Sequence, residues 1–138
     1  MTQNPLLLRA GQLFSILTGN RYSGLSVYDD GSSSVLLGNC ADESRPVPVG
    51  NMSEGTIDQL FLALRVASIE QAVKGGSILP VLADDLFINF DDGRAEAGFR
   101  VLGELAKSTQ VLFFTHHQRL LDIARKSLHP HETRVCNL

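Results

Sequence analysis

Polar side chains follow two apolar stretches in the second half of the chain. Asp84 and Asp85 come directly after the apolar run at residues 78–83, and His116 follows the run at residues 110–115. If both runs are parallel strands, these side chains meet at the edge of the sheet where α/β proteins bind ligands. One carboxylate can hold Mg²⁺ beside phosphate oxygens, a second can orient or deprotonate a water, and the histidine can donate to a phosphate. The alternative interpretation is an acidic loop and a surface histidine.

A second candidate for anion binding precedes the helix predicted over residues 54–74. Its loop contains Ser53, Glu54, Gly55 and Thr56. Ser53 stands at the N-cap position, where a side-chain oxygen accepts from free backbone N–H groups. A helix N-terminus beside a glycine also attracts anions, because unsatisfied donors and the helix dipole act together. The residues alone therefore allow both an ordinary cap and a phosphate site.

Three further polar segments have simpler interpretations. Asn89, Asp91 and Asp92 lie before the next predicted helix, which Asp91 or Asp92 is expected to cap. His117 is expected to point away from His116, because adjacent residues diverge in direction. A polar group near the end of the chain is interpreted as a solvated loop rather than a metal site, because a proline interrupts it. Its members are His129, His131 and Glu132.

Hydrophobic periodicity predicts the elements that position these residues. Helix and strand alternate from residue 54 onward, which predicts an α/β fold with a parallel sheet of buried strands and helices packed on it. The first third adds a helix and a β-hairpin as a small attachment, and residues 1–138 are expected to form a single domain. Five apolar residues of the helix at 54–74 share one face: Ile57, Leu60, Phe61, Leu64 and Ala67. Helices are predicted over residues 5–18, 54–74, 92–106 and 118–126, and strands over residues 22–28, 35–37, 46–49, 78–83, 110–115 and 133–138.

Composition excludes several classes of protein. The chain has 138 residues and a formal net charge of −3, so no global basic field indicates nucleic acid as a partner. Its two cysteines, Cys40 and Cys136, have no metal-type spacing, which favours a reducing cytoplasm. The sequence has no apolar run long enough for a membrane span and no signal-peptide pattern. It also lacks the phosphate-binding motif G-x-x-x-x-G-K-[ST].

Taken together, these segments resemble the C-terminal half of an ABC-type ATPase head of the SMC, SbcC and RecF kind, a P-loop NTPase-like fold. Residues 52–56, Met-Ser-Glu-Gly-Thr, and the helix after them are similar to the signature motif. Residues 78–85 resemble the Walker B strand, residues 89–92 the D-loop, and His116 the switch histidine. Residues 17–22 match the segment that follows the coiled coil in such proteins. The resemblance covers nearly the whole chain and is strongest to the large YhaN-like bacterial ATPases.

The resemblance implies a mechanism in which two heads enclose two ATP molecules. The signature residues, Ser53 to Thr56, would contact the γ-phosphate held by the opposite head. Asp84 would support Mg²⁺, Asp85 would act on the attacking water, and His116 would sense the γ-phosphate. The D-loop would communicate across the dimer through Asp91, with Asn89 and Asp92 beside it. The implied partners are an N-terminal Walker A lobe and a second head, and DNA comes from the resemblance alone.

Three departures from the family pattern qualify this expectation. Met52 stands where leucine is common, Glu54 replaces a glycine of the usual signature, and Asp85 replaces the common glutamate. Because the phosphate-binding loop is missing, the chain is expected to be one lobe of a larger protein, to bind ATP weakly and not to hydrolyse it alone. Two other functions stay open: a non-catalytic interaction module that keeps the fold, and a stand-alone Mg²⁺-dependent phosphohydrolase using Asp84, Asp85 and His116.

Overall fold

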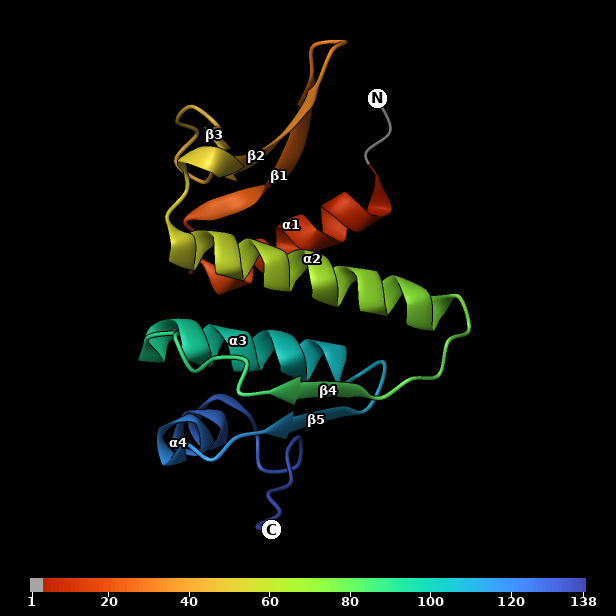
Figure 1. The fold of residues 1–138 in the computed structure, drawn as a ribbon, viewed down its shortest axis with the longest axis vertical. Coiled ribbons are helices and arrows are strands. Elements are labelled where there is room, and N and C mark those ends of the chain that lie inside the picture. Colours follow the sequence, from red (N-terminus) through yellow and green to blue (C-terminus); the bar gives the residue numbers. More distant parts are fainter. Residues whose placement is uncertain (1–3) are drawn as a thin grey trace. The chain divides into compact units, whose positions relative to one another are not determined.

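The computed structural model describes residues 4–138 and divides into two compact units. The first extends up to Ala72, and the second runs from Val73 to Leu138 (Figure 1). The prediction of a single domain stays a prediction, and each unit is described by itself. Within residues 4–138, no helix combines the length and the apolar character that crossing a membrane requires.

The first unit begins with helix α1, Pro5–Leu17, whose start is set by the sequence. Asn4 accepts a hydrogen bond from the backbone N–H of Leu6 at 2.9 Å, and Pro5 occupies a first-turn position that needs no N–H donor. Gly11 allows α1 to lie directly on strand β1, because a Cβ at this position would be 3.0 Å from the backbone nitrogen of Leu25. The predicted first helix is therefore confirmed.

A three-stranded antiparallel sheet follows α1 in the order β1-β2-β3. Strands β1, Tyr22–Asp29, and β2, Ser34–Cys40, form the predicted hairpin, and the short strand β3, Val47–Pro48, pairs at its edge. Asp30 stabilises the hairpin turn by accepting from the backbone N–H groups of Ser32 and Ser33. These hydrogen bonds to the charged carboxylate lower the pKa of Asp30.

Helix α2, Glu54–Lys74, follows a short 3₁₀ turn at Val49–Asn51 and has the predicted bounds. Its buried face includes Leu60 and Ala67 of the predicted apolar face but not Phe61. Phe61 is 59% exposed, whereas Gln59 is 2% exposed. The reason is a buried hydrogen bond, in which the Gln59 side-chain amide donates to the carbonyl of Leu17 at 2.5 Å. This bond directs the Gln59 side of the helix inward. The buried residues are Thr56, Gln59, Leu60, Leu62, Ala63, Val66 and Ala67.

The second unit contains two parallel strands and two helices. Strands β4, Val81–Asp84, and β5, Val111–Phe114, pair so that Ala83 lies opposite Phe113 and Asp84 opposite Phe114. Helix α3, Asp92–Leu105, connects them, and helix α4, Gln118–Ser127, follows β5 (Figure 1). Both strands therefore end at the same edge of the sheet, as the sequence predicts.

The prediction that both strands are buried is wrong for one face of the sheet. Phe113 contacts the buried ring of Phe99 from α3, with ring centroids 5.0 Å apart. The opposite face carries Leu82, Leu112 and Phe114, which are 66%, 37% and 44% exposed. β4 also begins three residues later than predicted, because Pro80 lacks an N–H for pairing. Buried parallel strands need cover on both faces, and in this unit the helices cover one.

The prediction of a last strand over residues 133–138 is also wrong. These residues have no regular secondary structure and pair with no strand in residues 4–138. Their alternating apolar pattern is suited to a strand, but pairing requires an available strand edge in the correct register. The segment instead forms one wall of a cavity described below.

An aromatic cluster holds the loop after β4 against α3. Phe87 is fully buried and packs against the rings of Phe90, Phe99 and Phe113, at centroid distances of 5.2, 5.0 and 5.4 Å. Gly98 of α3 leaves room for this ring, since a Cβ there would be 2.6 Å from Phe87 Cζ. Because Phe87 lies two residues after Asp85, this packing restricts the loop that carries the candidate site.

We expect Gly98→Ala to lower the free energy of unfolding by about 1–3 kcal/mol, because the added methyl overpacks a ring that has no free space. Gly93→Ala in the same helix is the matched control, since its Cβ would meet Asp91 Oδ1 at an ordinary 3.6 Å. The control should be neutral or slightly stabilising, because alanine favours helix. Urea unfolding followed by far-UV circular dichroism measures both, and equal stability of the two variants would contradict the packing argument.

Candidate functional site

Ser53 caps helix α2, as the sequence predicts. Its Oγ accepts a hydrogen bond from the backbone N–H of Thr56 at 3.2 Å and lies 2.8 Å from Thr56 Oγ1. Glu54 lies in the first turn, where its charge interacts favourably with the helix dipole, and Gly55 follows it. The ordinary cap is therefore present, and it leaves the Ser53 side chain exposed at the start of the helix.

Arg21 is a member of this group that sequence reasoning missed. Its Nη2 donates to Thr56 Oγ1 at 2.7 Å, across 35 residues of sequence. Thr56 is 2% exposed, so its own hydroxyl proton needs a buried acceptor, and the Ser53 oxygen supplies one. This assignment satisfies Thr56 and leaves the Ser53 hydroxyl proton free to be donated outward. The arrangement can therefore present one oriented O–H donor to an anion.

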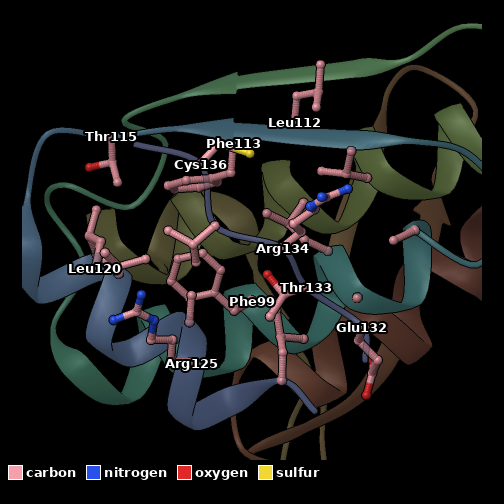
Figure 2. A pocket seen from close by; sticks show the side chains of 18 of the residues that line it. Phe99, Leu112, Phe113, Thr115, Leu120, Arg125, Glu132, Thr133, Arg134 and Cys136 are labelled. Carbon is pink, nitrogen blue, oxygen red and sulfur yellow. The ribbon is translucent and has the colours of Figure 1, made fainter. Parts of the chain in front are cut away.

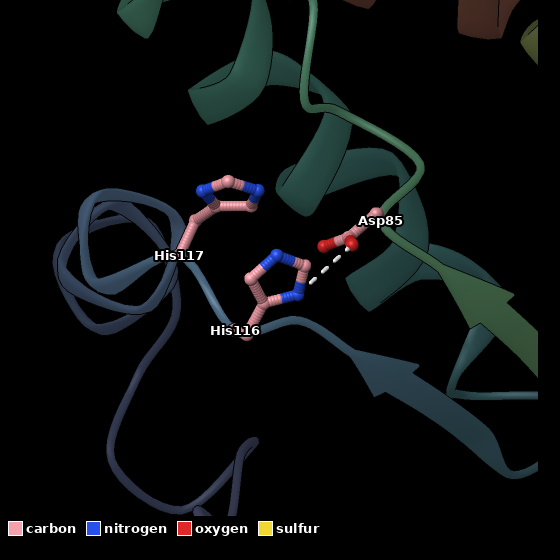
Figure 3. Close-up of side chains that lie close together, drawn as sticks. All are labelled: Asp85, His116 and His117. Atoms are coloured by element: carbon pink, nitrogen blue, oxygen red, sulfur yellow. Dashed lines mark ion pairs between the residues drawn. The ribbon is translucent and has the colours of Figure 1, made fainter.

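The second candidate group lies at the carboxyl ends of β4 and β5 (Figure 3). Asp85 has a positive φ of 48°, a conformation that is uncommon for residues other than glycine. Its backbone N–H donates to the carbonyl of Phe114 at 2.9 Å, which continues the parallel ladder by one bond. His116 Nδ1 lies 3.3 Å from Asp85 Oδ2, so a protonated imidazole forms an ion pair with this carboxylate. The structure thus brings together two of the predicted residues.

His117 joins the same group, and the expectation that it points elsewhere is wrong. The rings of His116 and His117 lie 4.3 Å apart (Figure 3). The chain turns after β5, because the backbone N–H of His117 donates to Thr115 Oγ1 at 3.1 Å. Because of this turn, the side chains of His116 and His117 do not point to opposite sides as successive side chains of a strand do. A threonine two residues before a histidine was the one signal in the sequence for such a turn.

Asp84 is not part of this cluster. It is the last residue of β4, and strand alternation places it on the same face as Leu82, opposite to Ala83. Its side chain is exposed, whereas the Asp85 side chain is 22% exposed. The adjacent carboxylates therefore have different surroundings, which is consistent with different roles.

Two of the three predicted D-loop residues make structural contacts within the second unit. Asp91 caps α3 by accepting from the backbone N–H of Arg94 at 2.8 Å. Asp92 pairs with Arg119 of α4 at 2.7 Å, and Asn89 is exposed. The capping interpretation is therefore confirmed for Asp91.

A cavity of about 610 Å³ lies between β5, α3, α4 and the last residues of the chain (Figure 2). Its walls combine apolar side chains such as Phe99 and Leu120 with Arg125, Glu132 and Arg134. His116 and His117 also line it at the end of β5, whereas Asp85 does not. Because the Asp85 carboxylate pairs with His116 at the strand ends, we assign the candidate site to the strand ends, which this cavity adjoins.

Comparison with solved structures identifies the fold. The chain matches an SMC ATPase studied for ATP-driven dimerisation and DNA-stimulated activation, with a TM-score of 0.66 and 15% identity over 88% of this chain and 73% of that one. It also matches the SMC head domain of Thermotoga maritima, with a TM-score of 0.63 and 21% identity over 90% of this chain and 42% of that one. A third match is the Smc head domain of Pyrococcus furiosus bound to the C-terminal domain of ScpA, with a TM-score of 0.61 and 17% identity over 87% of this chain and 30% of that one. The chain has the α/β fold of the C-terminal lobe of an SMC ATPase head, as the resemblance predicted.

Sequence comparison gives a more particular relative. The chain is 30% identical over 123 residues to the uncharacterized protein YhaN of Bacillus subtilis strain 168. The match covers 88% of this chain and 12% of that protein, so the chain spans about an eighth of its relative's length. No protein-family model matches the sequence. The predicted resemblance to YhaN-like proteins of the SMC class is confirmed.

We expect Arg21→Met to lower the free energy of unfolding by about 1–2 kcal/mol, because the buried Thr56 hydroxyl loses a charged hydrogen-bond donor. Arg65→Met is the matched control, since Arg65 is exposed on α2. Thr56→Val should have an effect at least as large, because it removes the hydroxyl that links Arg21 to Ser53. Chemical denaturation of the three variants measures these differences. Equal stability of Arg21→Met and Arg65→Met would contradict the role given to Arg21.

Proposed function

We propose that this chain is the C-terminal lobe of an ATPase head that hydrolyses ATP when joined to an N-terminal lobe and paired with a second head. The single observation that carries the proposal is the Asp85–His116 pair at the ends of two parallel strands in an SMC-head fold. Carboxyl ends of parallel strands are where α/β proteins bind ligands. A carboxylate beside a histidine at this edge can accept a proton from a water and orient it.

Each group receives one role in this proposal. Asp85 accepts a proton from the attacking water, and His116 donates a hydrogen bond to the γ-phosphate. The buried Asp85 Oδ1, which has no protein partner, fits the approach of a water. Asp84 is exposed beside this group and would hold Mg²⁺ through water, and the ion would neutralise charge on the phosphates. Asp91 keeps its capping bond, and its second oxygen, which lies 3.8 Å from Arg94 Nε, would be directed toward the partner head with Asn89 and Asp92 nearby.

The signature loop would act on a different nucleotide. Ser53 presents a hydroxyl donor at the start of a helix, and Gly55 and Thr56 lie in its first turn. Such a helix end favours negative charge, so it suits a γ-phosphate presented by the opposite head. Glu54 opposes this attraction in part, which predicts that the phosphate is bound through the Ser53 hydroxyl and backbone N–H groups. The oriented hydroxyl supports this role.

The exposed face of the β4–β5 sheet supports the need for another lobe. Parallel sheets are stable when both faces are covered, and two strands alone are marginal. Leu82, Leu112 and Phe114 form the uncovered face. We propose that the N-terminal lobe, which carries the phosphate-binding loop, provides further strands and cover.

We also propose a role in DNA repair or chromosome maintenance, which rests on the resemblance to SMC proteins. The proposed location is the cytoplasm, because the two cysteines are free.

We expect ATP-dependent dimerisation when the chain is co-expressed with a lobe that carries the phosphate-binding loop. Ser53→Arg should abolish it, because the larger side chain removes the hydroxyl and fills the phosphate position. Ser68→Arg, on the exposed side of the same helix, is the matched control. Light scattering with and without ATP measures the dimer. Dimerisation that survives Ser53→Arg would contradict the role of the signature loop, and no response to ATP in any variant would favour a non-catalytic module.

We expect Asp85→Asn to lower ATP hydrolysis by the assembled head about 10²–10⁴-fold, because the amide cannot accept the water proton. ATP-dependent dimerisation should persist, since binding does not need the base. Asp122→Asn on α4 removes an exposed charge in the same unit and serves as the control. The purified chain alone should release no phosphate. Hydrolysis by the chain alone that is lost in Asp85→Asn would instead establish the stand-alone phosphohydrolase.

A further inference from the structure

We propose that Asp85, His116 and His117 form a binding site for a divalent transition-metal ion, with Zn²⁺ as the best match. One ligand atom from each residue lies within 4.8 Å of the others. The Asp85 and His116 atoms are already 3.3 Å apart, and the two imidazole rings lie side by side (Figure 3). Small movements of the side chains therefore bring three donors to one ion.

Two unsatisfied atoms point to a missing partner in this cluster. Within residues 4–138, two buried side-chain nitrogen or oxygen atoms lack a hydrogen-bond partner, and they are Asp85 Oδ1 and His117 Nε2. A buried polar atom without a partner costs about 1–3 kcal/mol, so such atoms are rare in folded proteins. Both atoms belong to the cluster of three residues. A cation accepts lone pairs from a carboxylate and from neutral imidazoles, and so satisfies both at once.

The donor set identifies the class of ion. Two imidazoles and one carboxylate suit Zn²⁺ and related first-row ions, whereas Mg²⁺ and Ca²⁺ prefer oxygen donors. Three protein ligands leave a coordination position open for water, which is the pattern of reactive zinc sites. The ion is therefore different in kind from the Mg²⁺ expected with ATP.

The backbone around the cluster is held in place before any ion binds. The 2.9 Å bond from Asp85 N–H to the Phe114 carbonyl fixes one ligand, and the bond from His117 N–H to Thr115 fixes the turn that carries the other two. All of these residues belong to the second unit. Binding of the ion therefore requires neither ATP nor a second head, and it does not rest on the proposed function.

A bound ion would have a consequence for the proposed ATPase. It would occupy the Asp85 carboxylate and the His116 imidazole, which are the groups assigned to the water and the γ-phosphate. Micromolar Zn²⁺ should then inhibit hydrolysis by the assembled head, and a chelator should reverse the inhibition. This consequence rests on the proposed function, whereas metal binding by the chain does not.

The test uses the full chain with Cys40 and Cys136 replaced by serine, which removes the free thiols as competing ligands. The chelator-treated protein is titrated with Zn²⁺ by calorimetry and with Co²⁺ by visible absorption, which reports coordination geometry. We expect one ion per chain. His117→Ala and Asp85→Asn should each weaken binding by at least about 10–100-fold, the range seen even for outer-shell partners of metal ligands.

His131→Ala is the matched control, because His131 belongs to the other histidine-containing segment and lies outside the cluster. His116→Ala is a third ligand variant that should fold normally, since the His116 side chain is 79% exposed. Zn²⁺ should raise the melting temperature of the parent and of His131→Ala but not of His116→Ala. Absence of binding, or binding that His131→Ala weakens and the three ligand variants do not, would overturn the proposal. Neither result would change the outcome expected when Ser53→Arg is tested for dimerisation, so the two proposals can fail separately.

Discussion

The hydrogen bond from the Asp85 N–H to the Phe114 carbonyl is the constraint on which the candidate site depends. It extends the parallel ladder one residue past β4 and holds Asp85 at a positive φ of 48°. A conformation of this kind persists only where the surrounding structure imposes it. Phe87, two residues after Asp85, packs against three other rings and so also restricts this loop. The carboxylate is therefore directed toward the end of β5 and the histidines that follow it, while Asp84 stays on the exposed face.

The start of α2 also depends on hydrogen bonds to a buried polar group. A buried hydroxyl must have partners for its proton and for its lone pairs. Thr56 has partners for both in Ser53 and Arg21, which lie 2.8 and 2.7 Å from its hydroxyl oxygen. Residues that a sequence motif assigns to a ligand are thus oriented by residues outside the motif. Arg21 reaches this loop because the N-terminal helix and the first strand place it there, so the small N-terminal attachment contributes to the structure at the start of α2.

Sequence periodicity predicted the hairpin and all four α-helices found within residues 4–138, because these elements depend on contacts between neighbours in the chain. Most of the errors concern contacts between distant residues. Gln59 is buried because it reaches the carbonyl of Leu17, 42 residues away, and no local pattern encodes such a partner. The apolar character of both strands predicted where they lie, but burial of each face depends on what covers it. The prediction of a strand over residues 133–138 is wrong for a similar reason, because a strand forms only where the edge of another strand is available for pairing. For the site, Asp85 and His116 were predicted from their positions at strand ends, whereas the direction of His117 depends on a turn made by Thr115.

The exposed sheet face and the polar cluster at its end are both places where the second unit lacks partners. Parallel strands derive little stability from themselves, so they need packing on both sides, and their polar ends need partners of their own. In the second unit α3 satisfies one face, leaving Leu82, Leu112 and Phe114 without cover and Asp85 Oδ1 and His117 Nε2 without protein partners. The apolar requirement can be met by another lobe, and the polar one by a water, a nucleotide or an ion. These are separate requirements with separate solutions. Cover on the sheet face can therefore stabilise this unit while the polar strand ends stay open to a ligand.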